Sequence, residues 1–321
     1  MTLVVRMLNL RFSAALSLLT LSAAACTDAP TADDAESATT QGVAAMGTLH
    51  LAVERKIADI IALPSGASAF EASGVQLQNG QLWIVFDNMT KIAKINENLA
   101  SGSFASGGSV TSSQYEAITF DSNNTEHFYV AVEQANEQVV QYDSVASGAS
   151  ASTQSTNVTL NNQNKDFEGL AWVFRNNNDF LLGLCEGFSC TANHGGTGGT
   201  GQIIVMAQNS GSWTSVQTLN LPSAVQFKDY SDIGLFPNGD GSYKVAVTSQ
   251  ESKALWIGTL SATSWAFLDD GTIYPMPSSA YCNIEGVTWL NASQLAVVSD
   301  QNNSSDTTCD LKDQMIHYFN L

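Results

Sequence analysis

Oxygen-bearing side chains begin five strand-like segments of this sequence. The segments are SGVQL, EAITF, EGLAW, SDIGLF and EGVTW, and their first residues, which we call the anchors, are Ser73, Glu116, Glu168, Ser231 and Glu285. Carboxylates held close together raise one another's pKa unless a cation lies among them. Calcium accepts about six to eight oxygens in a flexible geometry, so serine and glutamate oxygens with added water suit it better than magnesium. We predict that the anchors bind Ca²⁺; the alternative is that they only cap strand ends by bonding backbone N–H groups.

A second polar set follows the anchors along the chain. After each anchor segment comes another apolar strand rich in β-branched and aromatic residues, for example LWIVF, FYVAV and QLAVVS. These strands are followed by the residues that we call the outer set: Asp87, Glu133, Glu186, Gln250 and Asp300. If the site is catalytic, the four acids of this set, Asp87, Glu133, Glu186 and Asp300, are the candidate general bases.

The spacing of the anchors predicts the fold. Successive anchors are 43, 52, 63 and 54 residues apart, and repeats of this length are typical of β-propellers. Only 13 % of the residues are charged and 24 are glycine, a composition that favours short strands and turns over helices. We therefore expect an all-β fold, a five-bladed propeller with four-stranded antiparallel blades. A six-bladed ring with a degenerate blade in the longest step is the alternative.

A propeller would bring both polar sets to one mouth of its central channel. The first strand of each blade lines the channel and starts at the face where the second strand ends, so the anchors and the outer set should form two concentric rings. The fifth repeat lacks a fourth strand. We expect KIADIIAL, residues 56–63, to pair with the last blade and close the ring, since closure removes open sheet edges.

The first 25 residues have the features of a secretory signal peptide. Arg6 and Arg11 precede an apolar run over residues 12–21, which is too short to span a bilayer, and three alanines lead into Cys26. This arrangement resembles a bacterial lipobox and predicts lipidation of Cys26; ordinary Ala-x-Ala cleavage beside an incidental cysteine is the alternative. Residues 26–47 then form the lipidated cysteine and an acidic disordered tether. Residues 48–321 form the propeller.

The remaining cysteines predict two disulfides. Removing Cys26 from the five cysteines leaves an even number, which suits an oxidising compartment. Cys185 and Cys190 are close in sequence, and a propeller places the loops of Cys282 and Cys309 on one face. We predict the pairs Cys185–Cys190 and Cys282–Cys309, in a protein anchored by lipid to the bacterial cell envelope, on the periplasmic or the cell-surface side.

The net charge excludes some partners. The chain has 12 basic and 30 acidic residues, for a formal charge of −18. Such a protein repels nucleic acids and anionic membrane surfaces, so we expect no nucleic-acid partner and no membrane contact except through the lipid. We expect a monomer whose partners are a small polar ligand or a protein.

The anchor segments, together with FEASGVQLQNGQLWIVFDN and YSDIGLFPNGDGSYKVAVTSQES, resemble the blade motifs of the calcium-activated nucleotidases, or apyrases. That resemblance implies a five-bladed propeller with a central calcium ion held by Ser73, Glu116, Glu168, Ser231 and Glu285. EGLAW and EGVTW are also similar to motifs of bacterial SdiA-regulated propellers.

Two functions agree with these features. The first is a calcium-binding module for a small polar ligand, a glycan or a protein partner. The second is a calcium-dependent hydrolase of phosphate esters, nucleotides or glycans, in which the ion polarises the substrate. Phosphate chemistry favours Arg or Lys clamps around the leaving group, and the motifs at the predicted mouth supply few of them. The binding module is therefore the preferred prediction.

Lipidation of Cys26 predicts a measurable adduct. The intact mass of protein extracted from membranes should include a diacylglyceryl group on a chain that begins at Cys26. Cys26→Ser should release the protein from the membrane or leave it unprocessed. An unmodified mature chain found free in the periplasm would contradict the anchor.

Overall fold

The repeated apolar segments fold into five β-sheets. The computed structural model describes residues 43–105, 114–124, 127–133, 138–143, 150–158, 167–188, 190 and 198–321. Each sheet has one innermost strand, and each innermost strand carries one anchor segment. These inner strands are β3 (Ala72–Gln78), β7 (Tyr115–Phe120), β11 (Phe167–Arg175), β15 (Asp232–Pro237) and β19 (Ile284–Asn291).

Antiparallel strands continue every blade outward. Blade 1 adds β4 (Gln81–Phe86), β5 (Met89–Asn96) and β6 (Gly102–Phe104). Blade 2 adds β8 (Phe128–Val132), β9 (Gln138–Tyr142) and β10 (Ser150–Ser155). Blades 3 and 4 add β12 (Asn178–Cys185), β13 (Gln202–Asn209) and β14 (Ser212–Asn220), and β16 (Tyr243–Ser249), β17 (Ala254–Leu260) and β18 (Thr272–Pro275). Blade 5 adds β20 (Gln294–Ser299), β21 (Met315–Asn320) and β2 (His50–Lys56). The predicted five-bladed architecture is confirmed.

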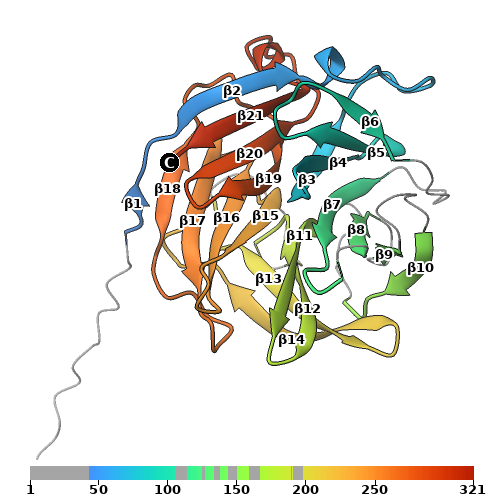
Figure 1. Ribbon diagram of the computed structural model, residues 1–321. Helices are drawn as coiled ribbons and strands as arrows, with labels where there is room; N and C mark the ends of the chain where they lie inside the picture. Colours follow the sequence, from blue (N-terminus) through green and yellow to red (C-terminus); the bar gives the residue numbers. More distant parts are fainter. Residues whose placement is uncertain are drawn as a thin grey trace, which may run out of the picture. The chain divides into compact units, whose positions relative to one another are not determined.

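The inner strands form a closed ring. In the order β3, β7, β11, β15 and β19, each inner strand contacts the next, and β19 contacts β3. Figure 1 shows these strands together around the centre, with β2, β10 and β14 at the periphery. All five inner strands therefore begin at one mouth of the channel and end at the other.

Apolar side chains fill the space between neighbouring blades. Because successive residues of a strand point to opposite faces, β4 serves two interfaces: Trp83 and Val85 pack against blade 2, whereas Leu82 and Ile84 pack against blade 5. Five hydrophobic clusters are found among the described residues, one at each blade–blade interface. The blades consequently stabilise one another in a ring, and the core lies between them.

The N-terminal strand closes the ring, but its residues differ from the prediction. β2 (His50–Lys56) pairs antiparallel with β21, so a strand over residues 56–63 is wrong. The chain instead enters the 3-10 helix η1 (Ile57–Asp59), where Ile60 and Ile61 both donate N–H bonds to the Ile57 carbonyl. This turn buries Ile57 and Ile61 between blades 5 and 1. Their spacing of four residues is typical of a helical turn.

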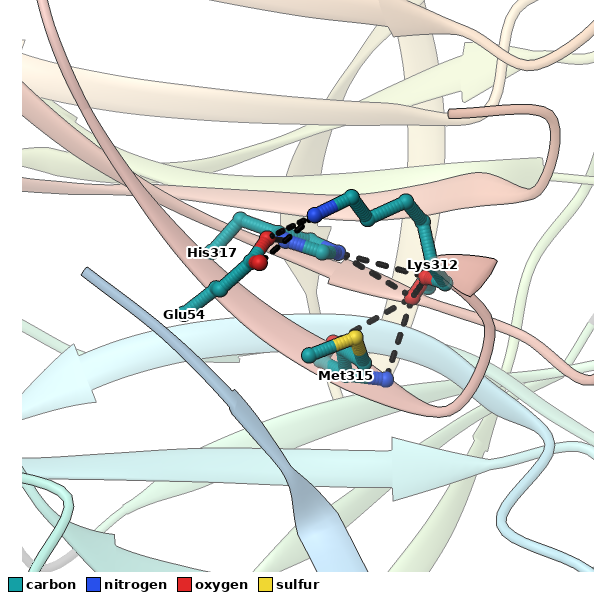
Figure 2. Close-up of polar contacts among 5 residues, drawn as sticks. Glu54, Lys312, Met315 and His317 are labelled. Carbon is teal, nitrogen blue, oxygen red and sulfur yellow. Dashed lines mark hydrogen bonds and ion pairs between the residues drawn. The ribbon is translucent and has the colours of Figure 1, made fainter. Parts of the chain in front are cut away.

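Three charged or titratable groups hold β2 against the last blade (Figure 2), and we call them the clasp. Lys312 Nζ lies 2.6 Å from Glu54 Oε1, and His317 Nδ1 lies 3.4 Å from Glu54 Oε2. His317 is fully buried, and burial lowers its pKa to about 4. Against the opposing effect of burial, Lys312 lowers the pKa of Glu54. The clasp therefore holds a neutral imidazole beside a charged Glu54–Lys312 pair.

Both predicted disulfides are confirmed. Cys185 bonds Cys190 and Cys282 bonds Cys309, with Cα atoms 5.1 and 5.4 Å apart. The second bridge joins the loop that enters β19 to the 3-10 helix η2 (Cys309–Leu311) that precedes β21. It therefore connects two loops of blade 5, and such bridges are typical of proteins in oxidising compartments.

The N-terminal segment is ordered earlier than the predicted tether allows. β1 (Ala45–Met46) pairs parallel with β18, and the Gly47 N–H donates to the Ile273 carbonyl at 2.8 Å. The open edge of β18 supplies the backbone partners for these residues. Cys26 and the predicted signal peptide lie outside the described residues. Neither of the 3-10 helices in the described ranges is long and apolar enough to cross a membrane.

The clasp predicts an acid-sensitive closure. A folded-state pKa of about 4 at His317, against about 6.5 in the unfolded chain, gives stability that is present above pH 6.5 and lost as pH falls toward 4. His317→Gln should remove this dependence, so wild type should lose about 3 kcal/mol more unfolding free energy over this range than the variant. Urea unfolding at several pH values measures the difference. His50→Gln, at an exposed position of β2, should behave as wild type, and equal pH profiles for wild type and His317→Gln would contradict the prediction.

Candidate functional site

Four anchors occupy the same irregular position of their strands. The pairing of each inner strand with its neighbour skips one residue near its start, which is the signature of a β-bulge. The skipped residues are Ser73, Glu116, Glu168 and Glu285. Bulges re-aim side chains at strand ends. The repeat seen in the sequence therefore corresponds to a repeated backbone device at one mouth of the channel, which we call the acidic mouth.

The serine anchors have structural partners. Ser231 immediately precedes β15 without a bulge, and its Oγ accepts the Gln250 N–H at 3.2 Å. Ser73 Oγ donates to the Tyr115 carbonyl on the neighbouring inner strand. The Ser231 bond agrees with the strand-capping alternative, whereas Ser73 bonds a carbonyl rather than a backbone N–H group. A hydroxyl that donates one bond still has lone pairs to offer a cation.

Directly after the anchors the inner strands approach very closely. The residues there, which we call the neck, are Gly74, Ala117, Gly169, Asp232 and Gly286. A Cβ atom on Gly74 would lie 2.8 Å from the Ala117 Cα, and one on Gly286 would lie 2.9 Å from the Val75 nitrogen. Larger side chains at these glycines would push adjacent inner strands apart.

Asp232 joins three inner strands at the neck. Its carboxylate accepts N–H bonds from Ile233 and Val287, both at 2.7 Å, and from Val75. The residue is 3 % exposed. Burial raises its pKa, and the three N–H bonds oppose that shift. The sequence interpretation missed this residue, although its sequence signal is plain: an acid stands where the other four repeats have glycine or alanine.

The acidic mouth concentrates negative charge. The outer set, namely Asp87, Glu133, Glu186, Gln250 and Asp300, directly follows the second strands β4, β8, β12, β16 and β20. Burial and the charges of Glu116, Glu186, Glu285 and Glu133 raise the pKa of Glu168 well above its usual value. Burial and the charges of Asp300, Asp229, Glu116 and Glu186 do the same for the pKa of Glu285. The glutamate anchors thus interact electrostatically with one another and with acids of the outer set.

Two acids of the outer set titrate far from their usual range. Burial, a hydrogen bond with Glu71 and the charges of Asp300 and Glu116 raise the pKa of Asp87 to about 9. Burial and the charges of Glu71 and Asp313 raise the pKa of Asp300 to about 7, against an N–H bond from Gln301.

Glu71 was missed by the sequence interpretation, and so was Asp229, which is buried and accepts bonds from Ser249 Oγ and the Glu251 N–H. Both lie two residues before an anchor, Glu71 before Ser73 and Asp229 before Ser231.

The side-chain oxygens at the acidic mouth are of the type that binds hard cations such as calcium. They are carboxylates and hydroxyls, and Asp87 Oδ1 is buried without a hydrogen-bond partner among the described residues. The carboxylate oxygens at the acidic mouth lie farther apart than the ligand atoms around a single bound cation. Among the His, Cys, Asp and Glu residues in the described part of the chain, only Cys282, Asp306 and Cys309 bring three ligand atoms within 4.8 Å of one another, and the two sulfurs form a disulfide. Direct binding of calcium by three anchor carboxylates therefore requires them to move closer.

No protein-family model matches the chain, and no curated protein matches it. Among solved structures, the chain is similar to glutaminyl cyclase from Myxococcus xanthus, with a TM-score of 0.54 and 7 % identity over 87 % of this chain and 97 % of that one. A PQQ-bound aldose sugar dehydrogenase from Streptomyces coelicolor gives a TM-score of 0.47 and 10 % identity over 84 % and 98 %. Regucalcin, a calcium-binding protein from Agrobacterium tumefaciens, gives 0.42 and 10 % over 78 % and 90 %. The first similarity shows a shared fold alone, and the two lower scores support no argument about function.

The repulsion at the acidic mouth predicts that replacing Glu168 by the neutral glutamine stabilises the metal-free protein. Because the pKa of Glu168 is raised in the folded protein, the protonated carboxyl group contributes stability at low pH, and this contribution is lost as pH rises. In the presence of chelator, Glu168→Gln should raise the Tm at pH 8 but not at pH 4. Each kcal/mol of relieved repulsion corresponds to about 2–4 °C in a domain of this size. Glu97 is exposed and follows the end of β5 that lies away from the acidic mouth, so Glu97→Gln should have no effect. A lower Tm for Glu168→Gln at pH 8 would refute the prediction.

Proposed function

We propose that this protein is a calcium-binding β-propeller of the bacterial cell envelope, anchored by lipid on Cys26, whose acidic mouth binds a small polar ligand, a glycan or a protein partner. The observation that carries the proposal is the concentration of acids at this mouth, with the pKa values of Glu168, Glu285, Asp87 and Asp300 all raised. Such an arrangement destabilises the folded chain at neutral pH unless a cation compensates for it.

Calcium is the cation that suits these donors best. It takes oxygen ligands in variable number and tolerates irregular geometry, and it retains water where the protein leaves gaps. Glu116, Glu168 and Glu285 are the charged ligands in this proposal, with Ser73 and Ser231 as neutral ones. A bound cation would lower the pKa of the surrounding carboxyl groups, so calcium uptake at pH 7 should release protons.

The second candidate is a calcium-dependent hydrolase of phosphate esters, nucleotides or glycans. One observation favours it: Asp300 has a pKa of about 7, near the value that suits a general base at neutral pH. With a pKa of about 9, Asp87 is protonated at neutral pH without a cation and is the weaker candidate. The segment that leads into blade 1 supplies the buried Ile57, Ile61 and Phe70 rather than a charged arm. Binding therefore remains the preferred function.

Calcium should stabilise the fold. At about 100 times its dissociation constant, a ligand specific for the native state adds about 2.7 kcal/mol to the unfolding free energy. The Tm of chelator-treated protein should rise on addition of calcium, and Glu168→Gln and Glu285→Gln should each reduce the rise. Differential scanning fluorimetry measures the shift, and a pH-indicator titration measures the released protons.

Glu97→Gln is the matched control and should retain the full shift. A Tm that is the same in chelator and in millimolar calcium would eliminate the ion. Incubation with nucleotides, phosphate esters and oligosaccharides separates the two functions. Product formation that requires calcium and is lost in Asp300→Asn would establish the hydrolase in place of the binding module.

A further inference from the structure

The opposite mouth of the channel contains a cavity with different chemistry. This cavity, of about 300 Å³, is lined by residues of blades 1 to 4, most of them on the inner strands beyond the neck. Gln76 and Gln78 come from β3, Thr119 from β7 and Trp172 from β11, and Tyr243 begins β16. The neck, with Asp232 buried in it, lies between these residues and the anchors along the strands. The cavity is therefore a site separate from the acidic mouth, and we call it the neutral pocket.

No lining residue of the neutral pocket is Asp, Glu, Lys, Arg or His. A charged ligand would lose hydration there without gaining an ionic partner among the lining residues, which is costly. The Arg175 guanidinium interacts electrostatically with Tyr243. That guanidinium is already bonded to the Ser264 and Ser261 carbonyls. Anions are disfavoured further by the chain's net charge of −18. The pocket therefore selects for a neutral ligand.

Polar groups in the neutral pocket are available for such a ligand. Among the described residues, no hydrogen bond involves the Gln78 amide or the Tyr243 hydroxyl, whereas the Gln76 amide donates to the Leu77 carbonyl at 3.3 Å. An amide and a phenol together offer both donors and acceptors. Ligand hydroxyls can use these groups in either direction.

Trp172, one of the residues that line the neutral pocket, is held rigidly in the packed interface between blades 2 and 3 and is 6 % exposed. The Trp172 ring stacks on Tyr129 with centroids 5.2 Å apart and meets the Trp213 ring edge-on at 6.0 Å. The Trp172 N–H of the backbone donates to Thr119 Oγ1 at 2.9 Å, which also fixes that hydroxyl. A preformed wall loses little conformational entropy when a ligand binds. The apolar residues Leu235 and Pro237 also line the pocket. Their surface, beside amides and hydroxyls, suits a molecule that has both C–H faces and hydroxyl groups.

We propose that the neutral pocket binds an uncharged monosaccharide or the end unit of an uncharged oligosaccharide. Its volume lies at the lower limit of small-molecule sites, about 300–1,000 Å³, which limits the ligand to about one ring. This site is independent of the calcium proposal, because none of its lining residues belongs to the anchors or the outer set.

Saturation-transfer NMR with glucose, galactose and maltose tests the neutral pocket, with glucosamine and glucuronate as charged counterparts. At least one neutral sugar should bind saturably, quench tryptophan fluorescence and outcompete its charged counterparts. Tyr243→Phe and Gln78→Met should each weaken binding about five- to tenfold. Tyr274→Phe, on β18 and outside the pocket, should leave binding unchanged.

Chelator and Glu168→Gln should also leave sugar binding unchanged, so failure of the calcium proposal would not affect this test. Absence of binding by all three neutral sugars would overturn the proposal. It would also be overturned if the charged sugars bound equally well, or if Tyr243→Phe and Gln78→Met both bound as wild type.

Discussion

The carboxylate of Asp232 joins three of the five inner strands where those strands lie closest together. Its bonds to the N–H groups of Ile233, Val287 and Val75 connect blades 4, 5 and 1 at the neck. Glycines at 74, 169 and 286 permit the approach that makes these bonds possible. A buried acid is costly unless it is fully hydrogen-bonded, so the neck depends on correct placement of all three partners. The neck thereby holds the inner strands of blades 4, 5 and 1 together between the two mouths.

Much of the fold was predictable because each repeat is locally consistent. Strands such as β4 alternate between two apolar interfaces, and an anchor recurs at the start of each inner strand, 43 to 63 residues after the one before it. The disulfide Cys282–Cys309 followed from blade topology, since the loops that enter the first strand and leave the second lie on one face. The closing strand was misplaced because KIADIIAL is as apolar as a strand. Its isoleucines are instead spaced to fill a gap between blades, and the more polar β2 forms the sheet edge.

The candidate site was predictable only where the repeat is strict. The glutamates at 116, 168 and 285 and the acids after β4, β8, β12 and β20 were found because they recur in phase. Glu71 and Asp229 each stand two residues before their anchor, where the other repeats have Gln114, Asp166 and Asn283. Because the residue type varies at this position, its role was overlooked, and the effect of Glu71 on Asp87 and of Asp229 on Glu285 comes from loops that approach in space. Asp232 breaks the repeat, and a search for similarity overlooks such a residue. The neutral pocket has no sequence motif because its members come from different positions of four blades.

The clasp also sets the order of events during synthesis. Glu54 and Lys312 are 258 residues apart, and joining ends separated by a chain of that length costs about 5 kcal/mol of conformational entropy. The hairpins of blades 1 to 4 involve only local contacts and can form while the chain is still being made. β2 has no partner until β21 has been synthesised, and meanwhile the apolar Leu51 and Val53 lie on an unpaired edge. The ring therefore closes last, and a nascent chain that stalls before β21 leaves both ends of the molecule open to aggregation.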